Sequence, residues 1–194
     1  MKYLIVIDFE ANCIENKVII PQEIIEFPAI PICIDTNTIE YDKLFHYYCN
    51  TDILVTEFAT NLTGITQEMC DNGKPFKEVL KLFQKWLFFN GFTIENSIIV
   101  TSGDWDFKTA FPNQCKYNNI KIPKFCKNWC NVKSVYKKVY NIKSGSMINM
   151  LANLDIKLEG KHHSGIDDTK NIAKICLCLL KNGGKFESIN YTFI

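Results

Sequence analysis

The chain has 194 residues, is 47% hydrophobic and 22% charged, and carries a formal net charge of +1. This length suits one compact domain with a sizeable core, and this composition excludes a disordered chain. The apolar run Tyr3–Ile7 stops at Asp8, too short for a signal peptide, and no stretch reaches the roughly 18 apolar residues of a transmembrane helix. The nine cysteines show no repeated C-x2-C pair, which argues against structural zinc and a disulfide framework. We therefore expect an intracellular protein, of the cytoplasm or the nucleus, with reduced and mostly buried thiols.

The charge is unevenly distributed along the chain. Residues 1–106 hold 7 lysines and 16 acids, whereas residues 107–154 hold 9 lysines and no acid. Seven aromatic residues are interleaved with the lysines of this second segment: Phe107, Phe111, Tyr117, Phe125, Trp129, Tyr136 and Tyr140. Lysine beside stacking surface is typical of nucleic-acid contacts, and the alternative is a solvated lysine face on ordinary helices. We favour polyanion binding by residues 107–154, because 48 residues without one acid is unusual.

The first third of the chain predicts three strands in hairpin-like succession. Lys2–Phe9 is a nearly unbroken apolar run, which indicates a strand buried on both faces. Glu23–Ile34 predicts a second strand, in which Pro28 and Pro31 demand bulges or an edge position. Ile39–Cys49 predicts the third strand. Because helices and a further strand follow, the order of elements predicts an α/β domain with a mixed sheet.

The rest of the chain alternates helix with strand. Residues 56–72 predict a loop with short helical turns, and Pro75–Asn90 predicts an amphipathic helix with its proline in the first turn. Ser97–Thr101 predicts a short buried strand, followed by a helix that begins at Asp104 or Trp105. The remaining predicted helices are Asn131–Tyr140, Ser146–Leu154 and Ser164–Lys181.

A first acidic cluster stands at the end of the first predicted strand. Asp8 and Glu10 are two residues apart, so both carboxylates project from the same face of a strand. Two carboxylates in a low dielectric repel each other unless a cation neutralises them, and carboxylate ligands select hard ions such as Mg²⁺ or Mn²⁺. The alternative is that Asp8 ends the strand as a turn residue and Glu10 is solvated.

A second acidic cluster, Gly103–Asp106, follows the predicted strand Ser97–Thr101. Open α/β sheets bind ligands at this end of their strands. Asp104 could cap the following helix, which would place Asp106 in the first turn and facing the site. Trp105 is either a core residue or a ring on which a base stacks.

A third acidic cluster surrounds the start of the last predicted helix. Ser164 followed three residues later by Asp167 predicts a capping box and a helix start at Ser164. Helical phase turns Asp168 towards the core and Asp167 towards water, so Asp168 is the candidate ligand. The alternative is a first-turn acid favoured by the helix dipole. His162 and His163 precede the helix, and composition does not decide between them as the residue that reaches a metal-bound water.

Together the clusters supply four inward acids and one histidine, each at the end of an element. This is the equipment for two-metal phosphodiester hydrolysis. Two divalent ions about 3.5–4 Å apart stabilise the attacking and leaving oxygens. A histidine titrating near neutrality takes the proton from the attacking water. We therefore expect two Mg²⁺ or Mn²⁺ ions as cofactors.

The ordered set Asp-x-Glu, then Asp, then His-x4-Asp resembles the DEDDh exonucleases, which have an RNase H-like fold. The match is closer to the Eri-1-like exoribonucleases, the branch that includes the 3′ exonuclease of histone messenger RNA. The stretches that carry it are Asp8–Cys13 (DFEANC), Gln22–Pro28 (QEIIEFP), Leu62–Ile65 (LTGI), Gly103–Asp106 (GDWD) and His163–Ala173 (HSGIDDTKNIA). The resemblance implies one exonuclease domain over residues 1–194, with an α/β, RNase H-like mixed sheet flanked by helices.

The resemblance also implies roles for particular residues. The metal ligands are Asp8, Glu10, Asp106 and Asp168, and the general base is His163, so that Glu10 and His163 take part in catalysis. A pocket for the terminal nucleotide is lined by Ala11, Phe58, Leu62, Thr63, Trp105 and Phe107. From the charge pattern, we further expect the lysine-rich segment to follow the RNA backbone, with contacts from Lys116, Lys124, Lys127 and Lys133. One departure is Asn12, where the family pattern has threonine.

The implied activity is a 3′-5′ exoribonuclease that trims the 3′ ends of structured or small RNA to nucleoside 5′-monophosphates. Ribosomal RNA, small interfering duplexes and stem-loops are all candidate substrates. Because Asp8 lies almost at the start, we expect substrate selection from residues 107–154 or from a partner protein. We expect a monomer that binds RNA and no membrane. The alternatives are a DNA-directed proofreading exonuclease or an oligoribonuclease, against which QEIIEFP and GDWD argue, and a non-catalytic module that binds RNA ends.

Overall fold

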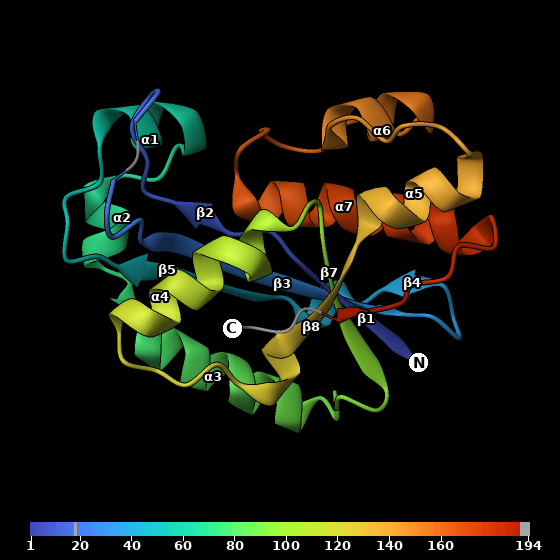
Figure 1. The fold of residues 1–194 in the computed structure, drawn as a ribbon, viewed down its shortest axis with the longest axis horizontal. Helices are drawn as coiled ribbons and strands as arrows, with labels where there is room; N and C mark the ends of the chain where they lie inside the picture. The colour runs from blue at the N-terminus through green and yellow to red at the C-terminus, as the bar shows by residue number, and fades with distance from the viewer. Residues whose placement is uncertain (18, 191–194) are drawn as a thin grey trace.

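The computed structural model describes residues 1–17 and 19–190 of the chain. Its strands are β1 (Tyr3–Ile7), β2 (Glu10–Ala11), β3 (Ile24–Cys33), β4 (Thr38–Ile39), β5 (Phe45–Asn50), β6 (Lys74–Pro75), β7 (Ser97–Thr101), β8 (Asn128–Asn131) and β9 (Ile189–Asn190). They form one sheet with the order β6-β5-β3-β1-β7-β8-β9, and β2 and β4 pair with β3 beside this path (Figure 1). β1 runs antiparallel to β3 and parallel to β7, so the predicted mixed sheet is confirmed.

Helices cover both faces of the sheet (Figure 1). The helical elements are η1 (Tyr41–Lys43), α1 (Glu57–Thr63), α2 (Gln67–Asp71), α3 (Phe76–Phe89), the π-helical turn η2 (Asp106–Ala110), α4 (Phe111–Tyr117), η3 (Lys124–Lys127), α5 (Val132–Tyr140), α6 (Met147–Asn153) and α7 (Gly165–Lys181). α3, η2 and α4 pack on one face, and α5, α6 and α7 pack on the other. Within the described part of the chain, the helices are too short or too polar to cross a membrane.

The side chains of β1 alternate between two cores. Ile5 and Ile7 join the cluster under α3, which includes the fully buried Phe83. Leu4 and Val6 join the cluster under α7. Strand side chains point to opposite faces in turn, and a strand covered on both faces reads as an unbroken apolar run. All nine cysteines are free thiols, and six of them are buried, which agrees with the expectation of mostly buried thiols.

β3 lies inside the sheet, which corrects the expectation of an edge position or a bulge at its prolines. The strand pairs with β1 on one side and with β5 and β4 on the other. The β1 register ends at Ala29, one residue after Pro28, and the β5 register also ends at Ala29, two residues before Pro31. Each proline thus lies where the ladder on one side has a gap, so its missing N–H costs no sheet hydrogen bond.

The third predicted strand is interrupted, which is a second correction. Within Ile39–Cys49 the chain leaves β4, makes the 3-10 turn η1 and re-enters the sheet as β5. The short strands β8 and β9 were not anticipated. By contrast, α3 and β7 match the predicted Pro75–Asn90 and Ser97–Thr101 closely. The long, strongly patterned elements are therefore the ones that the sequence predicts well.

Candidate active site

The acidic residues come together at one end of the sheet. β1 and β7 are parallel neighbours, so the residues that follow them meet at the same edge. Asp8 follows β1 directly, Asp106 begins the turn η2 after β7, and Glu10 begins β2. β1 ends before Asp8, and the pairing of β2 with β3 shifts register after Glu10. The two acids are thus not on one continuous strand, yet their carboxylates still converge.

Three of the four candidate ligands converge within bonding range of one ion. Carboxylate oxygens of Asp8, Glu10 and Asp168 all lie within 4.8 Å of one another. Asp168 is 3% exposed, and its buried Oδ1 has no hydrogen-bond partner among the described residues. Asp106 stands beside this group, because its Oδ1 accepts the backbone N–H of Phe9 at 2.9 Å. An unpaired buried carboxylate oxygen beside two further carboxylates fits a hard divalent cation.

Burial and mutual repulsion raise the pKa of the clustered acids. Burial, followed by the charges of Asp106 and Glu10, raises the pKa of Asp8 well above its usual 3.8. Burial and then the charge of Glu26 raise the pKa of Glu10 from 4.5 to about 9. Burial raises the pKa of Asp106 to about 6, although the Phe9 N–H lowers it in part. Without a cation Glu10 therefore holds a proton at neutral pH.

The two candidate histidines stand differently towards Asp168. His162 Nδ1 lies 2.9 Å from Asp168 Oδ2, and the backbone N–H of His163 donates to the same oxygen at 2.9 Å. The two imidazole rings are stacked, with their centroids 3.9 Å apart. His163 is exposed, and its backbone has a positive φ of 66°. Burial and then the charge of His162 lower the pKa of His163, which favours the neutral ring that accepts a proton.

The capping box predicted at the start of α7 does not form. Ser164 is the N-cap residue, as predicted, but within the described structure its side chain makes no capping hydrogen bond. Asp167 instead accepts the backbone N–H of Lys161 at 3.0 Å and so fixes the preceding loop. Asp168 points inward and Asp167 is partly exposed, as helical phase predicts. The first turn of α7 is capped by Glu26 of β3.

The residues predicted to hold the terminal nucleotide divide into two groups. Phe58 and Leu62 of α1 are partly exposed, and Trp105 is 39% exposed at the start of η2, so these three can offer surface to a ligand. Phe107 is fully buried among core rings and offers no exposed surface to a base. Thr63 is 4% exposed, and its hydroxyl donates to a backbone oxygen within α1.

Ala11, the remaining residue predicted to contact the nucleotide, lies beside a buried asparagine that fixes the local backbone. Ala11 is 6% exposed in β2, which leaves its backbone rather than its side chain for a ligand. Asn12, at the position that departs from the family pattern, is fully buried. Its Nδ2 donates to Leu54 O and its Oδ1 accepts the Thr56 N–H, each at 3.0 Å. Asn12 thus ties the end of β2 to the start of α1.

The aromatic residues of the lysine-rich segment do not gather on one exposed surface. Four of its seven aromatic residues are buried in the core: Phe107, Phe111, Trp129 and Tyr136. Lys133 follows β8 at the same edge as the acids, and its charge lowers the pKa of Asp106. Lys124 and Lys127 precede β8, at the opposite edge. Lys116 lies on α4, where it lines a separate cleft. Of the four predicted RNA contacts, Lys133 is therefore the one that stands by the acids.

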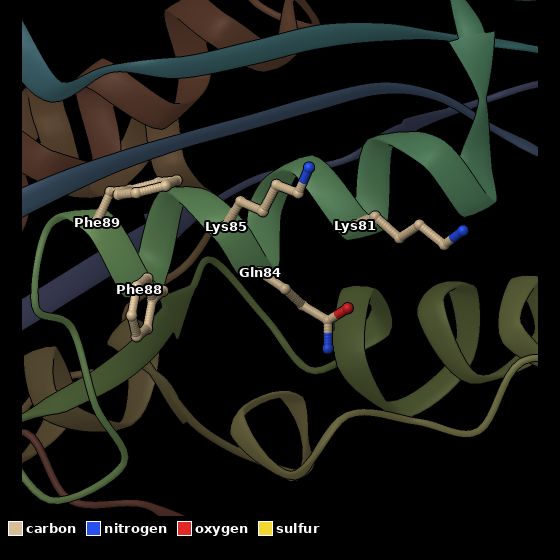
Figure 2. Close-up of a pocket in the computed structure, with 5 residues that line it drawn as sticks. All are labelled: Lys81, Gln84, Lys85, Phe88 and Phe89. Atoms are coloured by element: carbon tan, nitrogen blue, oxygen red, sulfur yellow. The ribbon is translucent and has the colours of Figure 1, made fainter.

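The most exposed rings among the described residues stand beside lysines on α3. Phe88 and Phe89 are 78% and 80% exposed at the end of this helix. With Lys81, Gln84 and Lys85 they line a shallow hollow (Figure 2). α3 ends before the chain enters β7, whereas Asp106 follows β7, so this surface lies at the far end of the sheet from the acids.

Asp104 has a structural position rather than a place in the acidic cluster. Its Oδ1 accepts the side-chain N–H of Asn131 at 3.0 Å and that of Trp129 at 3.4 Å. These bonds tie the loop after β7 to β8. Asp104 is thus a structural acid, whereas Asp106, two residues later, is a candidate metal ligand.

Comparisons with known proteins agree with this architecture. The exonuclease family model matches residues 5–176. The chain is 38% identical to ERI1 exoribonuclease 3 of Homo sapiens over 98% of this chain and 57% of that protein. It is 35% identical to 3′-5′ exoribonuclease 1 of Mus musculus over 93% of this chain and 54% of that protein. The chain therefore spans about half the length of the curated relatives it matches.

Solved structures show the same fold. The nuclease domain of 3′hExo, a DEDDh family member bound to rAMP, superposes with a TM-score of 0.93 at 32% identity, with 98% of both chains covered. A 3′-exonuclease described in 3′-end-specific recognition of the histone mRNA stem-loop superposes with a TM-score of 0.91 at 32% identity, over 96% of this chain and 66% of that one. The acids after β1, in η2 and in α7, the RNase H-like sheet and these matches show that the chain belongs to the DEDDh exonuclease family, in its Eri-1-like branch.

Proposed function

We propose that the chain is a 3′-5′ exoribonuclease that removes nucleoside 5′-monophosphates from RNA with the help of two divalent ions, Mg²⁺ or Mn²⁺. The observation that carries the proposal is the convergence of Asp8, Glu10 and Asp168 within 4.8 Å, with a buried Asp168 oxygen left unpaired among the described residues. Asp8, Glu10, Asp106 and Asp168 would hold the ions. When bound, such ions activate water and stabilise the charge that develops on the phosphate.

The protein's own groups divide the remaining work. A neutral histidine at the loop before α7 would accept the proton of the attacking water, and the lowered pKa of His163 suits this role. His162 is the alternative, because its ring contacts Asp168. Phe58 and Leu62 of α1 and the exposed Trp105 would hold the terminal base by apolar contact and stacking.

The proposed substrate is the 3′ end of a structured RNA such as a stem-loop. The relatives named as exoribonucleases and the neighbour described with a histone mRNA stem-loop support this choice over DNA or dinucleotides. We also propose that residues 1–194 act as one exonuclease domain and a monomer, with a partner protein for targeting. Strands from β1 to β9 share a single sheet, which supports the single domain.

The test is a time course on an end-labelled stem-loop RNA with a 3′ overhang, beside the DNA of the same sequence. Metal-dependent shortening of the RNA from its 3′ end is expected, and EDTA should stop it. Asp106→Asn should lower the rate by at least about 1,000-fold, since catalytic metal ions supply several kcal/mol of transition-state stabilisation.

Asp104→Asn is the matched control for this variant. It carries the same change two residues earlier in the chain, and the asparagine keeps an oxygen that can accept the bonds from Asn131 and Trp129. Its rate should stay close to that of the unmodified chain. Full activity of Asp106→Asn, or binding of RNA without any shortening, would exclude the proposed activity, and the second result would favour an RNA-end-binding module.

A further inference from the structure

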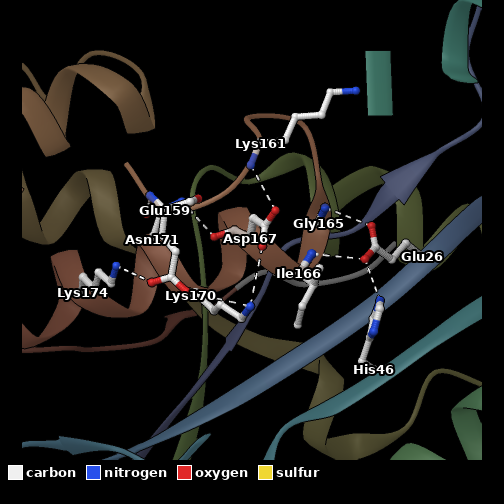
Figure 3. Close-up of polar contacts among 10 residues, drawn as sticks. All are labelled: Glu26, His46, Glu159, Lys161, Gly165, Ile166, Asp167, Lys170, Asn171 and Lys174. Atoms are coloured by element: carbon white, nitrogen blue, oxygen red, sulfur yellow. Dashed lines mark hydrogen bonds and ion pairs between the residues drawn. The ribbon is translucent and has the colours of Figure 1, made fainter. Parts of the chain in front are cut away.

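Glu26 of β3 is a buried acid outside the proposed set of metal ligands. Its side chain is 1% exposed. Oε2 accepts the backbone N–H of Gly165 at 2.9 Å, and Oε1 accepts that of Ile166 at 3.2 Å. Nε2 of His46, on β5, lies 2.7 Å from the same Oε1 (Figure 3). One carboxylate therefore joins β3, β5 and the first turn of α7.

The start of α7 takes its cap from this distant carboxylate. A helix leaves its first N–H groups without partners in the helix, and a polar N-cap side chain usually accepts one of them. Within the described residues Ser164 makes no such bond, and Glu26 accepts two of these N–H groups instead. Its negative charge also suits the positive end of the helix dipole. The first turn of α7 is thus tied to β3 rather than capped by its own N-cap side chain.

The contact leaves no space between the helix and the end of β1. A Cβ at Gly165 would lie 2.8 Å from Glu26 Oε2 and 2.9 Å from the carbonyl oxygen of Asp8. The first turn of α7 therefore packs directly on the peptide that carries a candidate ligand. Asp168 follows in that turn, and its N–H donates to Ser164 O at 2.8 Å. A displacement of the first turn would move Asp168 away from Asp8.

The charge of Glu26 also acts on the cluster. Glu26 is the register partner of Glu10 across β2 and β3, and its charge raises the pKa of Glu10 and of Asp8. A hydroxyl cap from Ser164 would hold the helix without this repulsion. Glu26 therefore acts on two parts of the structure. It caps α7, and its charge acts on Glu10 in the acidic cluster.

We propose that Glu26 is a positioning residue of the exonuclease site, which anchors the first turn of α7 against β1 and so holds Asp168 at ligand distance from Asp8. His46 of β5 contacts Oε1 of the same carboxylate. The inference rests on the proposed function, because it assumes that Asp8 and Asp168 bind a common ion, and it adds a residue that touches neither ion nor substrate.

Glu26→Gln is the test variant, and Glu23→Gln is its matched control. Glu23 is 3% exposed and accepts the backbone N–H groups of Asp52 and Ile53 at 3.0 Å each. The two variants thus make the same change at two buried glutamates that each accept two backbone N–H groups. They differ in what those groups hold, since Glu23 fixes a loop and Glu26 fixes α7.

Two readouts do not depend on cleavage. The first is Mn²⁺ affinity measured by calorimetry on the full chain without RNA. The second is the exchange rate of the Gly165 and Ile166 amide protons, measured by NMR without metal. Glu26→Gln should bind Mn²⁺ about 10- to 100-fold more weakly, as outer partners of metal ligands do, and both amides should exchange faster. Excess Mn²⁺ should restore its cleavage of RNA, whereas Glu23→Gln should match the unmodified chain throughout.

Equal Mn²⁺ affinity and equal amide exchange in Glu26→Gln and the unmodified chain would overturn the proposal. Equal losses in the two variants would also overturn it, because they would indicate a general effect on the fold. If Glu26→Gln does not fold, His46→Gln takes its place. His46 is 27% exposed, and among the contacts of Glu26 its replacement removes only that of Nε2 with Oε1. It should weaken Mn²⁺ binding in the same direction, and an unchanged affinity would refute the anchoring role. An unmodified chain that binds Mn²⁺ without shortening RNA would exclude the proposed function, while the affinities would still decide the role of Glu26.

Discussion

Replacing Glu10 with glutamine should stabilise the metal-free chain while it removes a proposed metal ligand. Burial and the charge of Glu26 raise the pKa of Glu10 from 4.5 to about 9. Between these two values the unfolded chain releases the proton that the folded chain keeps, so the free energy of unfolding falls as the pH rises. Each pH unit in this window lowers the free energy of unfolding by about 1.4 kcal/mol, so raising the pH from 5 to 8 lowers it by about 4 kcal/mol through Glu10. The whole free energy of unfolding of a typical domain is only about 5–15 kcal/mol.

Urea unfolding in EDTA, followed by circular dichroism at pH 5 and pH 8, measures this effect. The unmodified chain should lose stability between the two pH values, and Glu10→Gln should lose about 4 kcal/mol less. Glu15→Gln, at an exposed acid outside the cluster, is the control and should behave as the unmodified chain does. Mn²⁺ at pH 8 should stabilise the unmodified chain and act only weakly on Glu10→Gln. Identical pH dependence in the unmodified chain and in Glu10→Gln would refute the reasoning, because it would mean that Glu10 ionises freely in the fold.

Two further substitutions test the packing and the rim of the site. Gly165→Ala should lower the free energy of unfolding by about 1–3 kcal/mol, because its Cβ would meet Glu26 and the Asp8 carbonyl oxygen at under 3 Å. Urea unfolding measures this, and an unchanged midpoint would show that the first turn of α7 shifts freely. Trp105→Ala should raise the KM for RNA about 10-fold with little change in kcat, since a stacked base contributes about 1–3 kcal/mol. Tyr117→Ala removes a ring of similar exposure on α4, and an equal rise in KM there would contradict a specific role for Trp105.

The convergence of the acids could be predicted from the sequence because it follows from topology. A buried strand that ends in an acid places that acid at an edge of the sheet, and parallel strands share that edge. Asp8 after β1 and Asp106 after β7 satisfy this rule. Helical phase likewise turned Asp168 inward, and its exposure of 3% confirms it. These predictions needed only local patterns and one rule of sheet topology.

Surface features could not be predicted in the same way. Lysines interleaved with aromatic residues suggested a stacking surface, but Phe111, Trp129 and Tyr136 are buried in the cores. A helix or strand that alternates lysine with aromatic residues is equally the signature of an amphipathic element packed on a sheet. Phe88 and Phe89, the most exposed rings among the described residues, stand beside lysines on an acid-containing helix outside that segment. Sequence order alone does not show which side chains share a surface.

Contacts between distant segments were also beyond sequence reasoning. A glutamate in the apolar stretch Ile24–Phe27 is a visible signal, since a charge inside a buried strand requires partners. The partners of Glu26 are 139 and 140 residues away at the start of α7, where the sequence offered Ser164 and Asp167 as a sufficient local cap. The tertiary contact took the place of the local one. A buried charge of this kind indicates that a long-range anchor exists, but not what it holds.

The acids that define the site make the metal-free fold less stable, and the rest of the structure must offset that cost. Glu10, whose pKa is raised to about 9, holds a proton at neutral pH without a cation, so binding of a divalent ion must release that proton. Metal affinity should therefore rise with pH over the same range in which the metal-free fold weakens. The two cores on either side of the sheet and the anchor at Glu26 hold the carboxylates close in spite of their repulsion. The carboxylates are thus already gathered in the fold without an ion, and a buried acid such as Glu26 can contribute to their placement through the helix that it caps.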